Sequence, residues 1–122
     1  MTYLIRLPSY KEGDFILFRD SFFQISTIVR NKVHAVELSN WVEQVFDSKE
    51  LRKVHMVGGK ESIKEMILVS QTQNEIQAMD PKSYKIVYIK KPKKVSFDST
   101  MIKLVKLEEH VFLLPKKNAI NK

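Results

Sequence analysis

The chain has 122 residues, of which 43% are hydrophobic and 29% charged, and it contains no cysteine. This length is sufficient for one domain, or two very small ones, with a sizeable core. The absence of cysteine excludes disulfide scaffolds, thiolate zinc sites and cysteine nucleophiles, and it favours a reducing compartment.

The net charge of +7 lies entirely in the last third of the chain. Residues 81–122 carry eleven lysines against three acidic residues, whereas residues 1–80 carry ten basic and eleven acidic residues. Such an asymmetry favours a polyanionic partner, and nucleic acid is the commonest one.

Nothing in the hydropathy indicates a membrane or export segment. The longest apolar runs, such as 66–69 and 111–114, span four residues, far fewer than the roughly 20 that a membrane helix needs. Arg6 and Pro8 interrupt the apolar N-terminus, so no signal-peptide core is present. We therefore expect a soluble, cytoplasmic protein without a membrane partner.

Short β-rich runs separated by turn residues fill the first half, and long helical periodicity is missing. Asn31 tolerates a positive φ, so Asn31-Lys32 is expected to close a hairpin. In the run 22–29, alternation predicts one strand face made of Phe23, Ile25, Thr27 and Val29. The expected strands, which together suggest a small barrel, are residues 3–7, 15–19, 22–29, 33–38 and 41–46.

One short helix is predicted over residues 47–54. Asp47 can cap its first turn, and Glu50 follows at the spacing of a capping box. Leu51 and Val54 supply an apolar side. Gly58-Gly59 then marks the best internal boundary in the chain.

A second β-rich set follows this boundary. Residues 80–83 form a proline-containing turn, and Pro92 ends a strand because it cannot donate to a central ladder. The expected strands are residues 66–70, 75–80, 85–90, 100–107 and 110–114. The predicted division is a barrel with the helix over 1–59, a second small barrel over 60–115, and a flexible tail over 116–122.

Catalytic and metal motifs are missing from the sequence. His34, His55 and His110 lie far apart, and none pairs with a second ligand at metal-binding spacing. Three glycines are too few for a phosphate-cradling loop. We expect no cofactor and no small-molecule substrate, and an enzyme is the minority interpretation, since carboxylates brought together by folding remain an option.

The lysines after the run 85–90 are the strongest functional signal. Burying an unpaired ammonium is too costly, so Lys90, Lys91, Lys93 and Lys94 must face water or anions, and no acid lies between Lys82 and Lys94. If these four lysines contact duplex phosphates, affinity should fall roughly a hundredfold between about 50 and 200 mM salt.

Three aromatic residues could serve either packing or binding. For Trp41, packing in a core or between modules is favoured over a role as an exposed platform. Tyr84, at a turn among lysines, is a candidate for base stacking. Tyr88 lies on a strand that is apolar on both faces, which predicts that its ring is buried.

Several stretches together resemble a known family. They are RLPSYKEGDFILF, STIVRNKVHAVELSN, ILVSQTQNEIQAMDPKSYKIVYIKKP and VFLLP, in this order over about residues 1–115. They are similar to the C-terminal half of the nonsense-mediated-decay-three family, which are assembly and export adaptors of the large ribosomal subunit, with the compact archaeal members nearest.

The resemblance implies an SH3-like barrel beside an OB-like barrel, as in translation factor five-A, and docking near the tRNA exit side of the large subunit. Family members also carry N-terminal Cys-x-x-Cys zinc motifs and, in eukaryotes, export the particle through an exportin. This chain has no cysteine, so we expect a fragment or a shortened relative. It also lacks a leucine-rich export signal and an acidic tail, so the resemblance leaves an export role open.

The combined prediction is a mainly β protein of two small barrels, SH3-like then OB-like, that binds ribosomal RNA and ribosomal proteins of the large subunit without catalysis. Two alternatives stay open: a general RNA- or transcription-linked SH3/OB binder, and a module that recruits a protein strand by β-augmentation. The candidate RNA-binding residues are Arg30, Lys32, Lys82, Tyr84, Lys85, Lys90, Lys91, Lys93 and Lys94.

Overall fold

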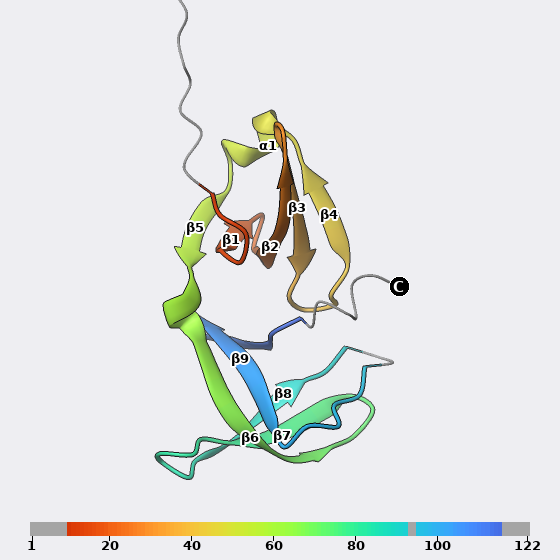
Figure 1. Ribbon diagram of the computed structural model, residues 1–122, viewed down its shortest axis with the longest axis vertical. Helices are drawn as coiled ribbons and strands as arrows, with labels where there is room; N and C mark the ends of the chain where they lie inside the picture. The colour runs from red at the N-terminus through yellow and green to blue at the C-terminus, as the bar shows by residue number, and fades with distance from the viewer. Residues whose placement is uncertain (1–9, 93–94, 116–122) are drawn as a thin grey trace, which may run out of the picture.

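The computed structural model describes residues 10–92 and 95–115. Two five-stranded antiparallel sheets follow one another along the chain and lie end to end along the long axis of the molecule (Figure 1). The prediction of a mainly β fold with two small modules and one short helix is confirmed. The strand expected at 3–7, Lys93, Lys94 and the tail 116–122 lie outside the described residues.

The first sheet has the strand order β4-β3-β2-β1-β5. Its apolar side chains close around an aromatic centre, where the fully buried ring of Phe46 meets Phe18 and Phe23 edge-on at 5.1 and 5.0 Å between centroids. The strands are β1 (Phe15–Phe18), β2 (Ser21–Val29), β3 (Lys32–Glu37), β4 (Glu43–Phe46) and β5 (His55–Gly58).

A β-bulge changes which residues of β2 face this core. The pairing with β3 shifts register between Ile25 and Thr27, and one extra residue reverses the alternation beyond that point. Phe23 and Ile25 are buried, but Thr27 and Val29 are exposed, and Ile28 packs against the core instead. The prediction of a single face continuing to Val29 is therefore wrong.

The β2–β3 hairpin closes one residue earlier than expected. Val29 pairs with Lys32, which leaves Arg30 and Asn31 as the two-residue turn. The positive φ of +55° belongs to Arg30 and not to Asn31. The expected Asn31-Lys32 turn is thus corrected, because Lys32 already belongs to the ladder.

Helix α1 (Ser48–Leu51) begins at the predicted capping box. The Asp47 carboxylate accepts from the Glu50 backbone N–H at 2.9 Å, and the Glu50 carboxylate accepts from the Asp47 N–H at 3.3 Å. Leu51 and the following Val54 are buried in the first core. A single helical turn therefore suffices to place two apolar side chains in the barrel.

The second sheet has the order β10-β9-β6-β7-β8, and β10 also contacts β8. This arrangement is a small, partly open five-stranded barrel, which is the OB architecture. Its core includes Met66, Ile76, Ile89 and Leu104. The strands are β6 (Ile63–Gln71), β7 (Glu75–Met79), β8 (Ile86–Lys90), β9 (Met101–Leu107) and β10 (His110–Leu113).

The two barrels are joined by a short connector and a shared apolar cluster. Only the residues 59–62, which include a 3-10 turn over Lys60–Ser62, separate β5 from β6. Phe15, Phe22 and Leu38 of the first barrel pack with Val105 and Leu107 of the second. The junction is therefore a buried interface and not an open linker.

Trp41 completes the junction from the first barrel. Its indole meets Phe97 edge-on at 6.2 Å between centroids and donates from Nε1 to the Leu113 carbonyl at 3.3 Å. Its backbone takes a φ of +60°, a conformation that bulky residues rarely adopt. The structure therefore supports a role of Trp41 in packing between the modules and not as an exposed platform.

Candidate nucleic-acid interface

The β7–β8 turn carries three of the candidate residues and is organised by Asp80. The Asp80 carboxylate accepts hydrogen bonds from the backbone N–H groups of Lys82 (2.8 Å) and Ser83 (3.4 Å). The backbone of Asp80 also pairs with Lys85 and accepts from Tyr84. One side chain thus fixes the loop that presents Lys82, Tyr84 and Lys85.

Asp80 is only 9% exposed, and its carboxylate forms an ion pair with the Lys64 ammonium. The hydrogen bond from Lys64, followed by the backbone N–H of Lys82, lowers the pKa of Asp80 from 3.8 to about 2. A carboxylate held in this way stays ionised well below neutral pH. The sequence predicts a turn at residues 80–83, but the organising role of Asp80 was not predicted.

This pKa shift gives a stability prediction. Because the folded pKa lies below the unfolded value of 3.8, ionised Asp80 stabilises the fold above about pH 4, and this contribution is lost as the pH falls towards 2. Asp80→Asn should therefore be less stable than the wild type at pH 7, with the difference shrinking as the pH falls through this window.

Urea denaturation at several pH values measures that difference. The control is Asp98→Asn, an exposed carboxylate of the same barrel, which should track the wild type throughout. A constant difference between the wild type and Asp80→Asn from pH 7 to pH 2 would contradict the assignment.

Two tyrosine rings stand out from this hairpin. Tyr84 is 73% exposed and has a φ of +61°, and Tyr88 is 66% exposed. The prediction that Tyr88 is buried is therefore wrong. On β8, the last strand of the hydrogen-bonded order, Val87 and Ile89 turn inward, whereas Ile86 and Tyr88 lie on the opposite, exposed face.

The described candidate lysines lie at both ends of β8 and not in one group. Lys82 and Lys85 precede the strand, and Lys90 and Lys91 lie at its far end, beyond a strand whose four residue steps span about 13 Å. Lys82, Lys85 and Lys90 are exposed and Lys91 is half-buried.

Acidic neighbours reduce this charge only in part. Glu75 lies opposite Lys90 in the β7–β8 ladder. Among the residues that the structure describes, ion pairs join only Lys64 with Asp80 and His34 with Glu43. None of the four candidate lysines is in either pair, so their ammonium groups are available to an external anion.

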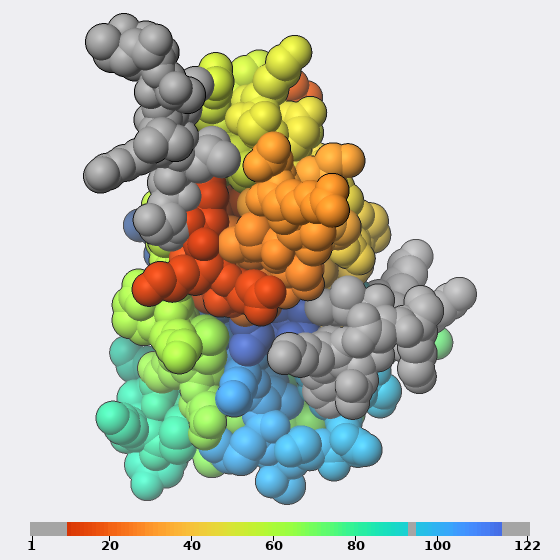
Figure 2. Space-filling view, turned by 45° about the horizontal axis from the view of Figure 1, so that its top comes forward, coloured from red at the N-terminus to blue at the C-terminus, as the bar shows by residue number. Residues whose placement is uncertain are grey.

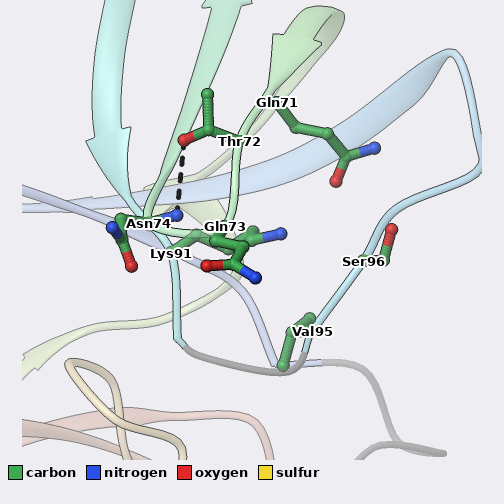
Figure 3. Close-up of a pocket in the computed structure, with 7 residues that line it drawn as sticks. All are labelled: Gln71, Thr72, Gln73, Asn74, Lys91, Val95 and Ser96. Atoms are coloured by element: carbon green, nitrogen blue, oxygen red, sulfur yellow. Dashed lines mark hydrogen bonds between the residues drawn. The ribbon is translucent and has the colours of Figure 1, made fainter.

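A polar cavity of about 730 Å³ opens beside Lys91 (Figure 3). Gln71 holds one wall, since its amide oxygen accepts from the Phe97 N–H at 3.1 Å and its amide nitrogen donates to the Phe97 carbonyl. This site was not predicted from the sequence, because residues 71–74 lie between two expected strands and carry no binding motif. The lining residues are Gln71, Thr72, Gln73, Asn74, Lys91, Val95 and Ser96.

Arg30 and Lys32 do not lie beside the lysines of β8. They line a separate cavity of about 380 Å³ at the β2–β3 hairpin tip, at the end of the first barrel that is remote from the second (Figure 1). Figure 2 likewise shows the orange hairpin and the teal segment near residue 80 on different parts of the surface. The structure therefore does not bring Arg30 and Lys32 to the lysines of β8.

The histidines serve separate local contacts. His34 lies 2.8 Å from Glu43, and His110 packs against the ring of Phe22, while His55 is exposed on β5. Within residues 10–92 and 95–115, no group of three or more His, Asp or Glu side chains is placed to hold a metal ion. The same described segments contain no helix long and apolar enough to cross a membrane.

The fold has counterparts among solved structures. The chain is similar to eukaryotic translation initiation factor 5A from Methanococcus jannaschii, with 10% identity, a TM-score of 0.52, and coverage of 90% of this chain and 92% of that one. A translation initiation factor eIF-5A family protein from Naegleria fowleri gives 9% identity, a TM-score of 0.48, and coverage of 91% and 94%. No family model and no curated protein matches the chain.

The match to the Methanococcus protein shows a shared two-barrel fold. It also corrects the resemblance to the nonsense-mediated-decay-three family, which is wrong: the structure that shares the fold is a translation initiation factor 5A, and no family model supports the other assignment. In the part of the chain that the structure describes, the stretches quoted for it consist mainly of strands and turns, such as the Asp80-Pro81 turn. Such segments follow from a two-barrel fold and do not identify one family.

Proposed function

We propose that this chain is a non-catalytic RNA-binding factor of translation that docks on the ribosome. The observation that carries the proposal is the surface of β8, where the exposed rings of Tyr84 and Tyr88 lie between lysines at both strand ends. Aromatic rings among cations are the usual means of holding single RNA strands. In OB barrels, the corresponding strands and their loops bind oligonucleotides.

Two further observations support the proposal. The fold is shared with a protein whose name is translation initiation factor 5A, and the ribosome is the RNA-rich particle on which translation factors work. The charge excess also falls on residues 81–122, and the described residues of this stretch, 81–92 and 95–115, lie in the part of the chain that forms the barrel with the exposed tyrosines. A cytoplasmic location is the expectation that follows.

The absence of catalysis is part of the proposal. The strongest pKa shift of the described residues holds the Asp80 carboxyl ionised, whereas a general acid or base near neutral pH needs a raised value. Asp80 is moreover engaged by Lys64 and by the backbone of its own turn. Its chemistry is therefore that of a structural anchor.

Charge reversal tests the proposal. The variant with Lys82, Lys85, Lys90 and Lys91 changed to Glu should bind purified ribosomes more weakly near physiological salt, because up to about four phosphate contacts, each worth about 0.9 in the slope of log K against log salt, are lost. Its affinity should also depend less on salt. Cosedimentation with separated ribosomal subunits over a range of KCl concentrations measures both quantities.

The matched control changes four exposed lysines of the first barrel and the connector, Lys11, Lys49, Lys53 and Lys60, to Glu. Both variants carry the same net charge, so a specific surface predicts that only the first loses binding. An equal loss of ribosome binding in the two variants would show that the effect comes from overall charge and not from a specific surface. Equal recovery of wild type and the Lys82/85/90/91 variant would remove these lysines from the interface.

The same assay addresses the finer expectations. Preference for the large subunit stays a prediction, which binding to the small subunit alone would contradict. A general RNA binder would be displaced by random RNA as readily as by ribosomal subunits. A β-augmentation module would instead bind a protein partner with little dependence on salt.

A further inference from the structure

The outer face of the second sheet carries a partly exposed apolar row. The register aligns Ile86 with Met79, Met79 with Ile67, and Ile67 with Met101, so the four side chains cross β8, β7, β6 and β9 on one face. Ile86 and Met101 at its ends are 46% and 41% exposed. Tyr88, two residues after Ile86, extends the row along β8.

The end of this face that lies next to the first barrel is packed against it, so the exposed row is not required for contact between the two barrels. Four residues before Ile67 on the same side of β6, Ile63 pairs with Val105, and both pack in the cluster shared with the first barrel. The first barrel thus covers one end of the face, whereas the row beyond it is only partly covered, since Ile67 and Met79 are half-buried and the ends of the row are exposed. Contiguous apolar surface of this kind marks a binding site.

The charged side chains around this apolar row indicate which class of ligand it fits. Lys85 and Lys90 bracket β8, and Lys103 lies beside the row on β9. Glu65, opposite Lys103, and Glu75, opposite Lys90, offset only part of this charge. A ligand that fits has flat apolar groups for the centre and anionic groups for the edges, which is the chemistry of unpaired nucleotides.

We propose that this face binds a single-stranded RNA segment, with unpaired bases stacked on Tyr88 and Tyr84 and phosphates at Lys85 and Lys90. The inference rests on the proposed function and narrows it from RNA in general to unpaired RNA. A duplex hides its base faces in the helical stack and offers mainly phosphates and 2′-hydroxyls. Exposed rings therefore add affinity only for bases that are free to leave a stack.

Both rings are held in place for this role. The Tyr88 hydroxyl accepts a hydrogen bond from the Gln77 amide across the β7–β8 ladder at 3.4 Å. Tyr84 is held by the Asp80 turn in a left-handed backbone conformation, with its ring directed to solvent. Tyr88 follows Tyr84 by four residues, at most about 13 Å of extended chain, so the site suits a short segment at the lower end of the roughly 4–16 nucleotides that an OB fold binds.

Fluorescence anisotropy with a labelled oligouridine and a labelled RNA hairpin of equal length tests the inference. The wild type should bind oligouridine more tightly than the hairpin stem. Tyr88→Ala should weaken oligouridine binding about 5- to 150-fold, the loss of one stacked base, and change hairpin binding little. Tyr88→Phe keeps the ring and should retain the affinity for oligouridine.

Tyr84→Gly provides a second variant, since glycine removes the ring and also suits the positive φ, so weaker binding could not come from a disturbed turn. Equal affinity for both RNAs, or unchanged oligouridine binding in the Tyr84→Gly/Tyr88→Ala double variant, would overturn the inference. If lysine-dependent ribosome binding persisted in that case, the proposed function would stand without it. If the variant with Lys82, Lys85, Lys90 and Lys91 changed to Glu bound ribosomes as well as the wild type, both the proposed function at this surface and the further inference would be overturned.

Discussion

Phe46→Ala should lower the free energy of unfolding by about 3–5 kcal/mol, the usual cost of truncating a buried phenylalanine. Phe46 is fully buried, and its ring meets Phe18 and Phe23 edge-on. The truncation removes both ring contacts and leaves a cavity between strands whose backbones are fixed by hydrogen bonds. Since small domains are stable by about 5–15 kcal/mol, this loss would bring the protein close to unfolding.

Urea denaturation followed by circular dichroism measures this effect. Phe46→Leu fills most of the volume and should cost clearly less, which separates the cavity from the loss of aromatic contacts. Val45→Ala, at the neighbouring exposed position on β4, serves as the control and should stay within about 0.5 kcal/mol of the wild type. A loss below about 1 kcal/mol for Phe46→Ala would show that Phe46 is not central to the core.

Trp41→Ala should cost about 2–4 kcal/mol and loosen the junction of the two barrels. The change removes the contact with Phe97 and the hydrogen bond to Leu113. The expected cost lies below the range of about 3–5 kcal/mol for a fully buried tryptophan, because Trp41 is only half-buried and alanine tolerates the φ of +60° no worse. Chemical denaturation gives the stability.

Amide hydrogen exchange tests the coupling of the barrels. In Trp41→Ala, exchange should accelerate at residues 104–107 and 110–113, which face the junction, more than in β7. Trp41→Phe retains an aromatic ring and should lose about 1 kcal/mol for the missing hydrogen bond. The adjacent exposed Val42, changed to Ala, is the control. Uniform exchange in both barrels of Trp41→Ala would mean that the indole does not couple them.

Local signals in the sequence account for much of the observed fold. Strands bounded by turn residues were predicted well because alternation and turn chemistry depend on neighbouring residues, and the capping box at Asp47 and Glu50 is present in the structure. The errors concern information that is not local. The bulge at Ile25 and the exposure of Tyr88 depend on the partner strand and on which strand is last in the sheet.

For the candidate site as well, features that depend on neighbouring residues were predictable and features that depend on tertiary structure were not. Exposure of Lys90 was predictable because an unpaired ammonium resists burial. The placement of Lys82 and Lys85 at the opposite end of β8, and of Arg30 in the other barrel, depends on tertiary structure. The role of Asp80 was within reach of sequence reasoning, because an aspartate before proline favours a side-chain-capped turn.

The close approach of backbone and side chains at the connector has a consequence for ligand selection. A Cβ atom added to Gly58 would meet the Ser62 hydroxyl and would lie 2.8 Å from Leu107 Cδ2, so little free space remains where the barrels meet. The hairpin tip of Arg30 and the strand of Lys90 are consequently held at a set separation. Under the proposed function, an RNA that reaches both would gain effective concentration at the second contact only where its own phosphates match this distance, so that RNA surfaces would be distinguished by their geometry without any reading of bases.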